Sequence, residues 1–315
     1  MLIFVTSLLV LSQSVHTEII SPKIIQNDNK AKEVFTSRGG MEGWSWVSFM
    51  VGLDGPPSDI IVFDYSGKQR YVKSTLAYIE NLTFSPATVN GVPMIGERNI
   101  FLPHSFSGLG FSVGSVTAVF KRDYQEILDT INTQNGISEA RALIDNLKED
   151  HTKTLHEHAM AAYLESLYFY KSKNFLEYMR QSQIALNLYE YLPLKMLSKT
   201  VVNLFEAQLY YGYFTEAAST LRIMKSIEGL NLSDEVAANF QEQLQNKMKA
   251  NLPNKVKGQL TPLGAWIYYN NFQKFKIANV NGIIDSVKLR CVGFYQTYSK
   301  GWYKELEIPI EAKRC

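Results

Sequence analysis

Apolar and polar positions alternate in the segment from Ser45 to Val51. One side of the segment carries Val47, Phe49 and Val51, and the other side carries Trp46, Ser48 and Met50. A period of two residues is typical of a β-strand with one face against a core. The turn-forming pair Asp54 and Gly55 follows, and then a β-branched run from Ile60 to Phe63. We therefore expect the two runs to form a hairpin.

The period changes after this hairpin. Between Gln69 and Asn81 the apolar positions fall at i, i+4 and i+7, on Val72, Leu76 and Ile79, which predicts a helix with one buried face. Residues 99–106 are predicted to form a third strand, in which Pro103 cannot donate a ladder hydrogen bond. This strand should therefore lie at a sheet edge or bulge there. Together these elements predict a small β-β-α-β domain within residues 18–115.

Residues 118–252 are predicted to be helical and to contain an internal repeat. Three similar segments recur at nearly equal spacing, at residues 136–140, 174–178 and 213–217. They resemble the tetratricopeptide repeat (TPR), although the spacing of roughly 38 residues exceeds the usual 34. The resemblance implies an α-solenoid whose stacked helix pairs share a core and whose concave surface binds a peptide or another protein. An ordinary helical bundle without a ligand is the alternative.

Residues 258–315 are predicted to form a small β module. Their β-branched and aromatic content favours strands at 266–277, 286–293 and 302–310, with turns at 281–282 and 300–301. The two cysteines of the chain, Cys291 and Cys315, both lie here. An even count in an exported protein favours a disulfide between them, and two separate thiols are the alternative. Such a module would cap the open end of the solenoid.

The amino end, residues 1–17, is expected to be a secretory signal peptide. An apolar run from Leu2 to Leu11 precedes Ser12 and Ser14, the small residues of a cleavage site. The run is too short to cross a bilayer, which takes about 20 apolar residues. An interfacial anchor or a buried strand is the alternative. We expect membrane association to be peripheral at most.

The net charge and the candidate catalytic or metal-binding residues mainly exclude classes of function. The net charge is +2, from 32 basic and 30 acidic residues, without a basic block, which argues against nucleic acid as a partner. His151, His156 and His158 lack zinc-protease spacing, because position 160 is Met, and we expect them on a solvated polar face. The glycine-rich stretch from Gly108 to Gly114 is not a P-loop. The sequence therefore predicts no catalytic residue, no metal site and no cofactor.

The order of features between Gly40 and Phe106 resembles the C-terminal domain of TonB, the periplasmic protein that energises outer-membrane transporters. The shared order is Glu-Gly-Trp, an alternating strand, Asp-Gly, a second strand, an amphipathic helix, Phe-x-Pro-Ala, Asn-Gly-x-Pro and a last strand. The residues that carry it are Glu42, Gly43, Trp44, Phe49, Val51, Gly55, Phe84, Pro86, Ala87, Asn90, Gly91 and Pro93.

The resemblance implies a non-enzymatic adaptor in the periplasm of a Gram-negative envelope. Its partner would be an outer-membrane transporter or another TonB-system component, whose extended peptide pairs with the exposed edge of the sheet. In this family the last strand accepts the peptide, which here implies Asn99, Ile100, Phe101 and Leu102. The sequence departs from a full energy transducer, because it shows no long N-terminal membrane helix and no proline-rich spacer. It would support transport beside a true TonB, or bind the same partners without energising them.

The sequence thus predicts an α+β protein with three parts: a TonB-like domain, a TPR-like solenoid and a disulfide-closed β module. One alternative function is a TPR scaffold for envelope protein assembly, in which the first domain only helps the chain to dimerise. Another is an exported enzyme such as a hydrolase, for which we find no catalytic constellation.

Overall fold

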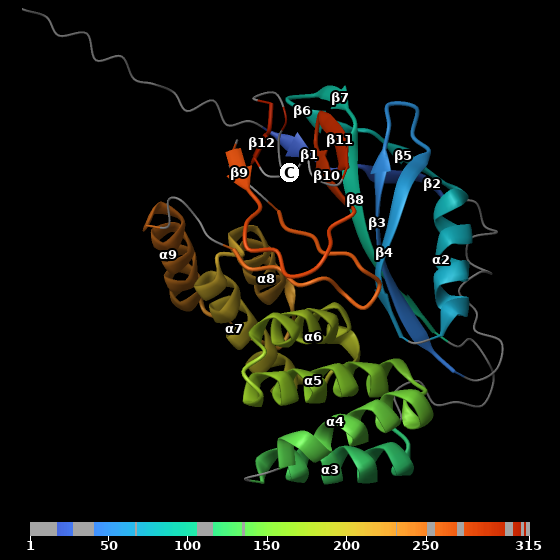
Figure 1. The fold of residues 1–315 in the computed structure, drawn as a ribbon, viewed down its shortest axis with the longest axis vertical. Helices are drawn as coiled ribbons and strands as arrows, with labels where there is room; N and C mark the ends of the chain where they lie inside the picture. Colours follow the sequence, from blue (N-terminus) through green and yellow to red (C-terminus); the bar gives the residue numbers. More distant parts are fainter. Residues whose placement is uncertain are drawn as a thin grey trace, which may run out of the picture.

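The structure is a computed structural model that describes residues 18–27, 41–66, 68–105, 116–133, 136–230, 232–250, 256–269, 274–299, 305–309 and 312. In these residues the chain is a mixed α+β protein. The strands of the first hundred residues and of the C-terminal part lie together beside a stack of helices (Figure 1). The expected signal peptide lies outside the described residues. No described helix combines the length and the apolar composition that a membrane span requires.

The main sheet has three antiparallel strands in the order β4-β3-β8. They are β3 (Gly43–Val51), β4 (Pro57–Tyr65) and β8 (Gly96–His104). The predicted hairpin is β3–β4, and the predicted helix is α2 (Gln69–Glu80), which covers one face of the sheet (Figure 1). The third strand begins three residues earlier than predicted and ends at His104. Pro103 does lie in an edge strand of this sheet, as expected.

Strand β3 is enclosed on both faces, whereas its alternating pattern predicted a single buried face. Val47, Phe49 and Val51 enter the core beneath α2. On the opposite face Ser48 and Met50 are also buried. The prediction was wrong because the helical stack and the C-terminal part cover this second face. The pattern of β3 alone cannot reveal such a cover.

Several short strands flank the main sheet and were not predicted. They are β1 (Ile19–Ile20), β2 (Lys23–Asn27), β5 (Leu82–Ser85), β6 (Ala87–Val89) and β7 (Val92–Met94), arranged as sheets β1-β6-β7 and β2-β5. Asn90 and Gly91 close the β6–β7 hairpin with φ angles of 50° and 80°. A two-residue hairpin turn with both φ angles positive favours this Asn-Gly pair.

The helices form successive antiparallel pairs. The α-helices are α3 (Ala118–Asn132), α4 (Gly136–Asn146), α5 (Leu155–Lys171), α6 (Phe175–Asn187), α7 (Leu194–Tyr211), α8 (Phe214–Ser226) and α9 (Asp234–Ala250), with a π-turn η1 (Leu147–His151) and a 3-10 turn η2 (Tyr189–Tyr191). The three repeated sequence segments stand at equivalent places, at the starts of α4, α6 and α8. The side chain of Thr117 caps α3 and that of Asn174 caps α6, which satisfies first-turn N–H groups.

The C-terminal part differs from the predicted three-stranded module. Its strands are β9 (Lys274–Lys276), β10 (Ser286–Cys291), β11 (Phe294–Ser299) and β12 (Glu305–Glu307), in two separate pairs, β10-β11 and β12-β9. Of the strand expected at 266–277, β9 is the only part that forms among the described residues of that range. Residues 266–269 are coil, and there Trp266 and Tyr268 stack on one another and Tyr268 packs on Tyr213 of the helical stack.

Strand β10 turns directly into β11 at Val292 and Gly293, where Gly293 has φ 85°. The sequence predicted the end of a strand there but not the return strand. Cys291 is fully buried and disulfide-bonded. Its pairing with Cys315 stays a prediction, because Cys315 lies outside the described residues.

Candidate functional site

Strand β8 has one edge against β3 and one edge facing away from it. The carbonyl of Trp44 accepts from the N–H of Ser66, beyond the end of β4, so the main chain of Trp44 faces β4. Trp44 lies opposite Pro103, and this is therefore a non-hydrogen-bonded pair in the ladder with β8. The main chain of Pro103 consequently faces outward. Because directions alternate along a strand, Asn99 and Phe101 face outward as well.

The outward edge of β8 already has a main-chain hydrogen-bond partner at one end and lacks a main-chain donor at the other. The N–H of Gly293 donates to the carbonyl of Ile95 at 2.8 Å, just before β8 begins. At the other end Pro103 has no N–H. Between them, in the part of the chain that the structure describes, no backbone hydrogen bond reaches the outward N–H and C=O groups of Asn99 or Phe101. We call these main-chain groups of Asn99 and Phe101 the open rim of β8.

The four predicted partner-binding residues divide between the two faces of the sheet. Ile100 and Leu102 pack into the core beneath α2. Phe101 lies on the other face and stacks on Trp44, with ring centroids 5.1 Å apart. All four side chains are half-buried. Of the four, only Asn99 and Phe101 therefore have main-chain groups that face away from β3.

The Asn99 side chain joins two elements on the helical side of the sheet. Its Oδ1 accepts from Nε1 of Trp46 at 2.6 Å, and its Nδ2 donates to the hydroxyl of Tyr269 at 3.0 Å. The Tyr269 main chain is held at the start of α8, since its N–H donates to Oε1 of Glu216 at 3.5 Å and its carbonyl accepts from Thr215. The segment before β9 thus passes beside the open rim.

Glu216 is an unusual carboxylate in this arrangement. Its Oε2 is buried and has no hydrogen-bond partner. Burial raises the pKa of Glu216 to about 7, opposed only in part by main-chain hydrogen bonds from Glu216 itself and from Tyr269. The group is therefore poised to change charge near neutral pH.

The β10–β11 hairpin is fixed to the sheet by a buried arginine. The Nη1 of Arg290 donates to Oγ of Ser48 at 2.8 Å and lies 3.4 Å from Oε1 of Glu97. Its Nη2 donates to the carbonyl of Asp59 at 2.8 Å. Lys288 forms an ion pair with the Asp59 carboxylate. These contacts hold the hairpin at the end of the open rim where Gly293 meets Ile95.

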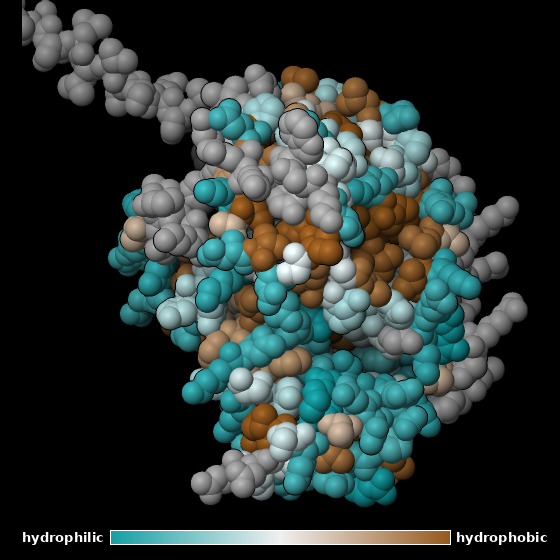
Figure 2. Space-filling model, in the orientation of Figure 1, coloured by the Kyte–Doolittle hydropathy of each residue, from teal (hydrophilic) through white to brown (hydrophobic). Residues whose placement is uncertain are grey.

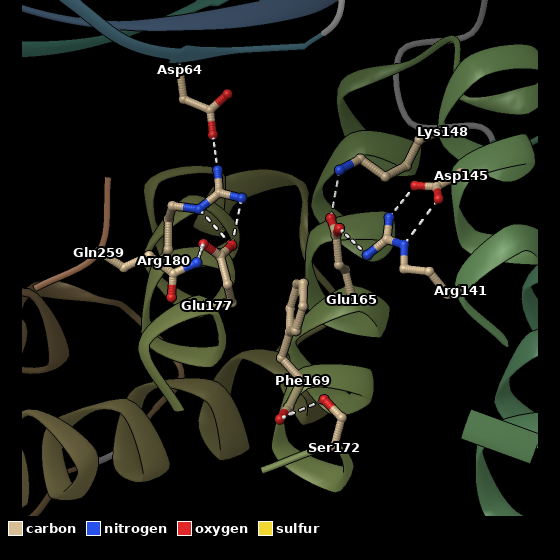
Figure 3. A network of polar contacts seen from close by, with 10 residues as sticks. All are labelled: Asp64, Arg141, Asp145, Lys148, Glu165, Phe169, Ser172, Glu177, Arg180 and Gln259. Carbon is tan, nitrogen blue, oxygen red and sulfur yellow. Dashed lines mark hydrogen bonds and ion pairs between the residues drawn. The ribbon is translucent and has the colours of Figure 1, made fainter. Parts of the chain in front are cut away.

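Ion pairs also fix the sheet to the helices. Figure 3 shows Asp64 of β4 reaching down to Arg180 of α6, which also pairs with Glu177 at 2.6 Å. Gln259 of the C-terminal segment donates to Glu177 as well. Beside this group Glu165 of α5 is almost fully buried, between Arg141 and Lys148 (Figure 3). The sheet therefore occupies part of the surface that the helices would otherwise present.

The nine residues expected from the TonB motif serve mainly to build the fold. They are Glu42, Gly43, Trp44, Phe84, Pro86, Ala87, Asn90, Gly91 and Pro93. The Oε2 of Glu42 accepts from the N–H of Leu155 at the start of α5, at 2.7 Å. A side chain on Gly43 would collide with the ring of Tyr71. Phe84 packs on Phe49 with ring centroids 5.1 Å apart. Among these residues, Trp44 touches a residue of the open rim through its stack on Phe101.

A serine, a threonine and a histidine meet inside the sheet layer. Nε2 of His104 lies 3.2 Å from Oγ of Ser45 and 2.9 Å from Oγ1 of Thr75. All three are fully buried, and burial lowers the pKa of His104 to about 4. Because solvent and substrate cannot reach the three side chains, the contact links β3, α2 and β8 and is not a catalytic arrangement.

The solvated face expected for the three histidines forms only in part. His151 and His156 are partly exposed, whereas Glu157 and His158 are buried. Glu157 accepts from the main-chain N–H groups of Thr117, Lys153 and Thr154. His158 approaches the carbonyl of Glu42 at 3.2 Å, and burial lowers its pKa to about 4. These residues join α5 to α3 and to the sheet.

Metal sites and a hydrolase-type nucleophile are two further kinds of site to consider. In the described ranges, no three His, Cys, Asp or Glu side chains are grouped so that they could hold a metal ion. Residues 110–114 read Gly-Phe-Ser-Val-Gly, which matches the Gly-x-Ser-x-Gly pattern of hydrolase nucleophile elbows. They lie outside the described residues, and the pattern alone does not assign a catalytic role.

The face of the molecule seen in Figure 2 has an uneven polarity. Apolar surface gathers over strands β3 and β4 and the C-terminal segment, whereas the helical stack below is mostly hydrophilic. Val280 and Ile283 of the C-terminal segment are among the exposed apolar residues. Apolar surface that gathers in this way is typical of a docking region.

Comparisons with known proteins place the chain in no group. No family model matches it, and no curated protein and no solved structure matches it either.

Proposed function

We propose that this chain is a non-enzymatic adaptor that binds an extended segment of another protein at the open rim of β8. One observation carries the proposal: the outward N–H and C=O groups of Asn99 and Phe101 have no backbone partner within the described residues. Unpaired main-chain groups on an edge strand are a template for an added strand.

The resemblance to the TonB C-terminal domain supplies the partner class. We infer an exported protein of the periplasm whose partner is an outer-membrane transporter or a TonB-system component. Supporting this are the order of strand, strand, helix and strand in β3, β4, α2 and β8, and the edge position of β8. The partner would be held without being energised by this chain alone.

The rim is short, and this limits how tightly a strand can bind through main-chain contacts. Gly293 closes it at one end and Pro103 removes a donor at the other. Each hydrogen bond contributes only about 1 kcal/mol net. Specific binding therefore needs side-chain contacts as well, for which the apolar surface seen in Figure 2 is a candidate.

Phe101→Pro and Phe101→Ala form a matched pair that tests the rim. Both variants lose the stack on Trp44, but only proline removes the outward N–H. The ladder with β3 does not use that N–H, so both variants should fold. In pull-downs from solubilised envelope fractions, we expect the alanine variant to retain a transporter or TonB-system component that the proline variant loses. Equal capture by both variants, or capture of neither component by the unmodified chain, would overturn the proposal.

A second candidate function is a helical scaffold for envelope assembly. In its favour, aromatic rings are exposed at the turns of the helix pairs: Tyr170 is 55% exposed and Tyr210 is 77% exposed. Phe175 and Tyr211 join them into one cluster, with ring centroids 5.8 Å apart. If this function holds, Tyr170→Ala with Tyr210→Ala abolishes partner capture, whereas Phe101→Pro does not.

A further inference from the structure

A hollow of about 380 Å³ lies in the helical stack, where the turn η2 and the start of α7 meet the end of α8. It is lined by Tyr189, Glu190, Leu192, Leu194, Leu197, Ser226, Ile227 and Glu228. This volume is near the lower end for ligand sites. The hollow therefore suits one or two side chains of a partner and not a large cofactor.

The lining separates an apolar floor from an acidic border. Leu192, Leu197 and Ile227 are buried and form the floor. Leu194 is 48% exposed and remains available as an apolar wall. Burying it against a ligand would remove apolar surface from water, which is favourable.

Every charged residue that lines the hollow is a carboxylate. Glu190 and Glu228 both lie at the surface. The hydroxyl of Tyr189 donates to Oε1 of Glu190 at 3.2 Å, which orients that carboxylate and leaves its second oxygen for another donor. The hollow thus combines an apolar interior with two negative charges at the solvent side.

We propose that this hollow binds a lysine or arginine side chain of a partner protein, next to an apolar residue of the same partner. Basic side chains bury their alkyl stems on apolar surface while the charged head stays near water. Here the stem would lie on Leu192, Leu194 and Leu197, and the head would donate charge-assisted hydrogen bonds to Glu190 and Glu228. This recognition does not use the open rim of β8.

Three short peptides test the chemistry: acetyl-Leu-Arg-Leu-amide, the same peptide with norleucine in place of arginine, and acetyl-Gly-Arg-Gly-amide. Binding to the full chain is followed by the methyl NMR signals of Leu194, Leu197 and Ile227. We expect the first peptide to shift these signals, and the other two to bind about tenfold more weakly, since each lacks the charge or the apolar part. Added salt should weaken the first peptide's binding, because the paired charges are near solvent.

The carboxylates are tested by Glu190→Gln combined with Glu228→Gln. Both side chains are exposed, so the double variant should fold. We expect it to bind the arginine peptide about tenfold more weakly than the unmodified chain does, and to bind the norleucine peptide with unchanged affinity. The matched control is Glu149→Gln with Asp150→Asn, two exposed acids of η1, which should change nothing. Equal binding of arginine and norleucine peptides, equal binding by the double variant, or no shift of these methyl signals would overturn the proposal.

Discussion

The hydroxyl of Tyr269 accepts a hydrogen bond from Nδ2 of Asn99 at 3.0 Å, across 170 positions of sequence. Asn99 belongs to the open rim of β8, and Tyr269 is fixed by its main chain to the start of α8. This contact ties the C-terminal segment, the helical stack and the edge strand to one another. The open rim therefore lies at a junction of three parts of the chain.

Tyr269→Phe removes the acceptor and leaves the ring in place. We expect the free energy of unfolding to fall by about 1 kcal/mol, the usual net value of one hydrogen bond. Urea unfolding measures it. Tyr295→Phe, at an exposed tyrosine of β11, is the control and should change stability much less. Equal effects of the two substitutions would contradict a stabilising role of the hydrogen bond between Asn99 and Tyr269.

Pro103→Val restores the main-chain donor that the rim lacks. Proline in an edge strand prevents pairing with other chains, so we expect the variant to self-associate or to capture extended segments more strongly. Sedimentation analysis at several concentrations measures the association. Pro193→Ala, at the N-cap of α7, is a control that leaves the edge unchanged. A variant that remains unchanged in both association and capture would show that Pro103 does not limit the rim.

Arg290→Met removes the charge that fixes the β10–β11 hairpin to the sheet. It leaves the carboxylates of Asp59 and Glu97 without this partner in a buried setting, which costs about 3 kcal/mol or more. We expect a large loss of unfolding free energy in urea. Lys288→Met should cost less, because Lys288 is 30% exposed and a partly exposed ion pair contributes little. The reverse order would contradict the anchoring role of Arg290.

His104 and His158 make stability depend on pH on the acid side. Burial lowers the pKa of each from about 6.5 to about 4, so the folded protein holds them neutral. The contribution of the two neutral histidines to the free energy of unfolding is fully present above pH 6.5 and is lost as the pH falls toward 4. The loss is at most about 3 kcal/mol for each. Urea unfolding between pH 7 and 4 measures it, and His104→Gln should flatten the profile. An unchanged profile in that variant would contradict the burial effect.

Glu216 makes stability depend on pH in the opposite direction, near neutral pH. Its pKa is raised to about 7 by burial, so the protonated form is the stable one in the folded state. The protonated carboxyl of Glu216 contributes to the free energy of unfolding at low pH, and this contribution is lost as the pH rises through 7. Glu216→Gln should therefore raise the unfolding free energy at pH 8 by about 1 kcal/mol or more, and have little effect at pH 5. A destabilising effect at pH 8 would contradict this.

Local signals predicted the elements of the first domain well. The hairpin β3–β4, the helix α2 and the edge position of β8 follow from alternation, from the helical period and from Pro103. The short strands β1, β2 and β5 were missed, because two to five residues give too little pattern to separate strand from turn. The return strand β11 was missed because its tyrosines and Thr297 follow the turn at Gly293 without a clear break.

The surroundings of the candidate site could not be read from sequence. Nothing local indicates that Arg290 lies against Ser48, or that Asn99 lies against Tyr269, since these contacts join distant segments. The same holds for the second face of β3, which only the complete fold covers. The predicted rim residues were found at a sheet edge, but the limits set by Gly293 and Pro103 appear only once the strand register is known.

Amide hydrogen exchange of β8, measured residue by residue, tests the central claim most directly. In the free protein, the amides of Asn99 and Phe101 should exchange rapidly, whereas those of Ile100 and Leu102, which face β3, should be protected. When a captured envelope segment is added, protection should appear at Asn99 and Phe101 alone within the strand. Protection of these two amides in the free protein, or no change when the segment binds, would contradict strand addition at this rim.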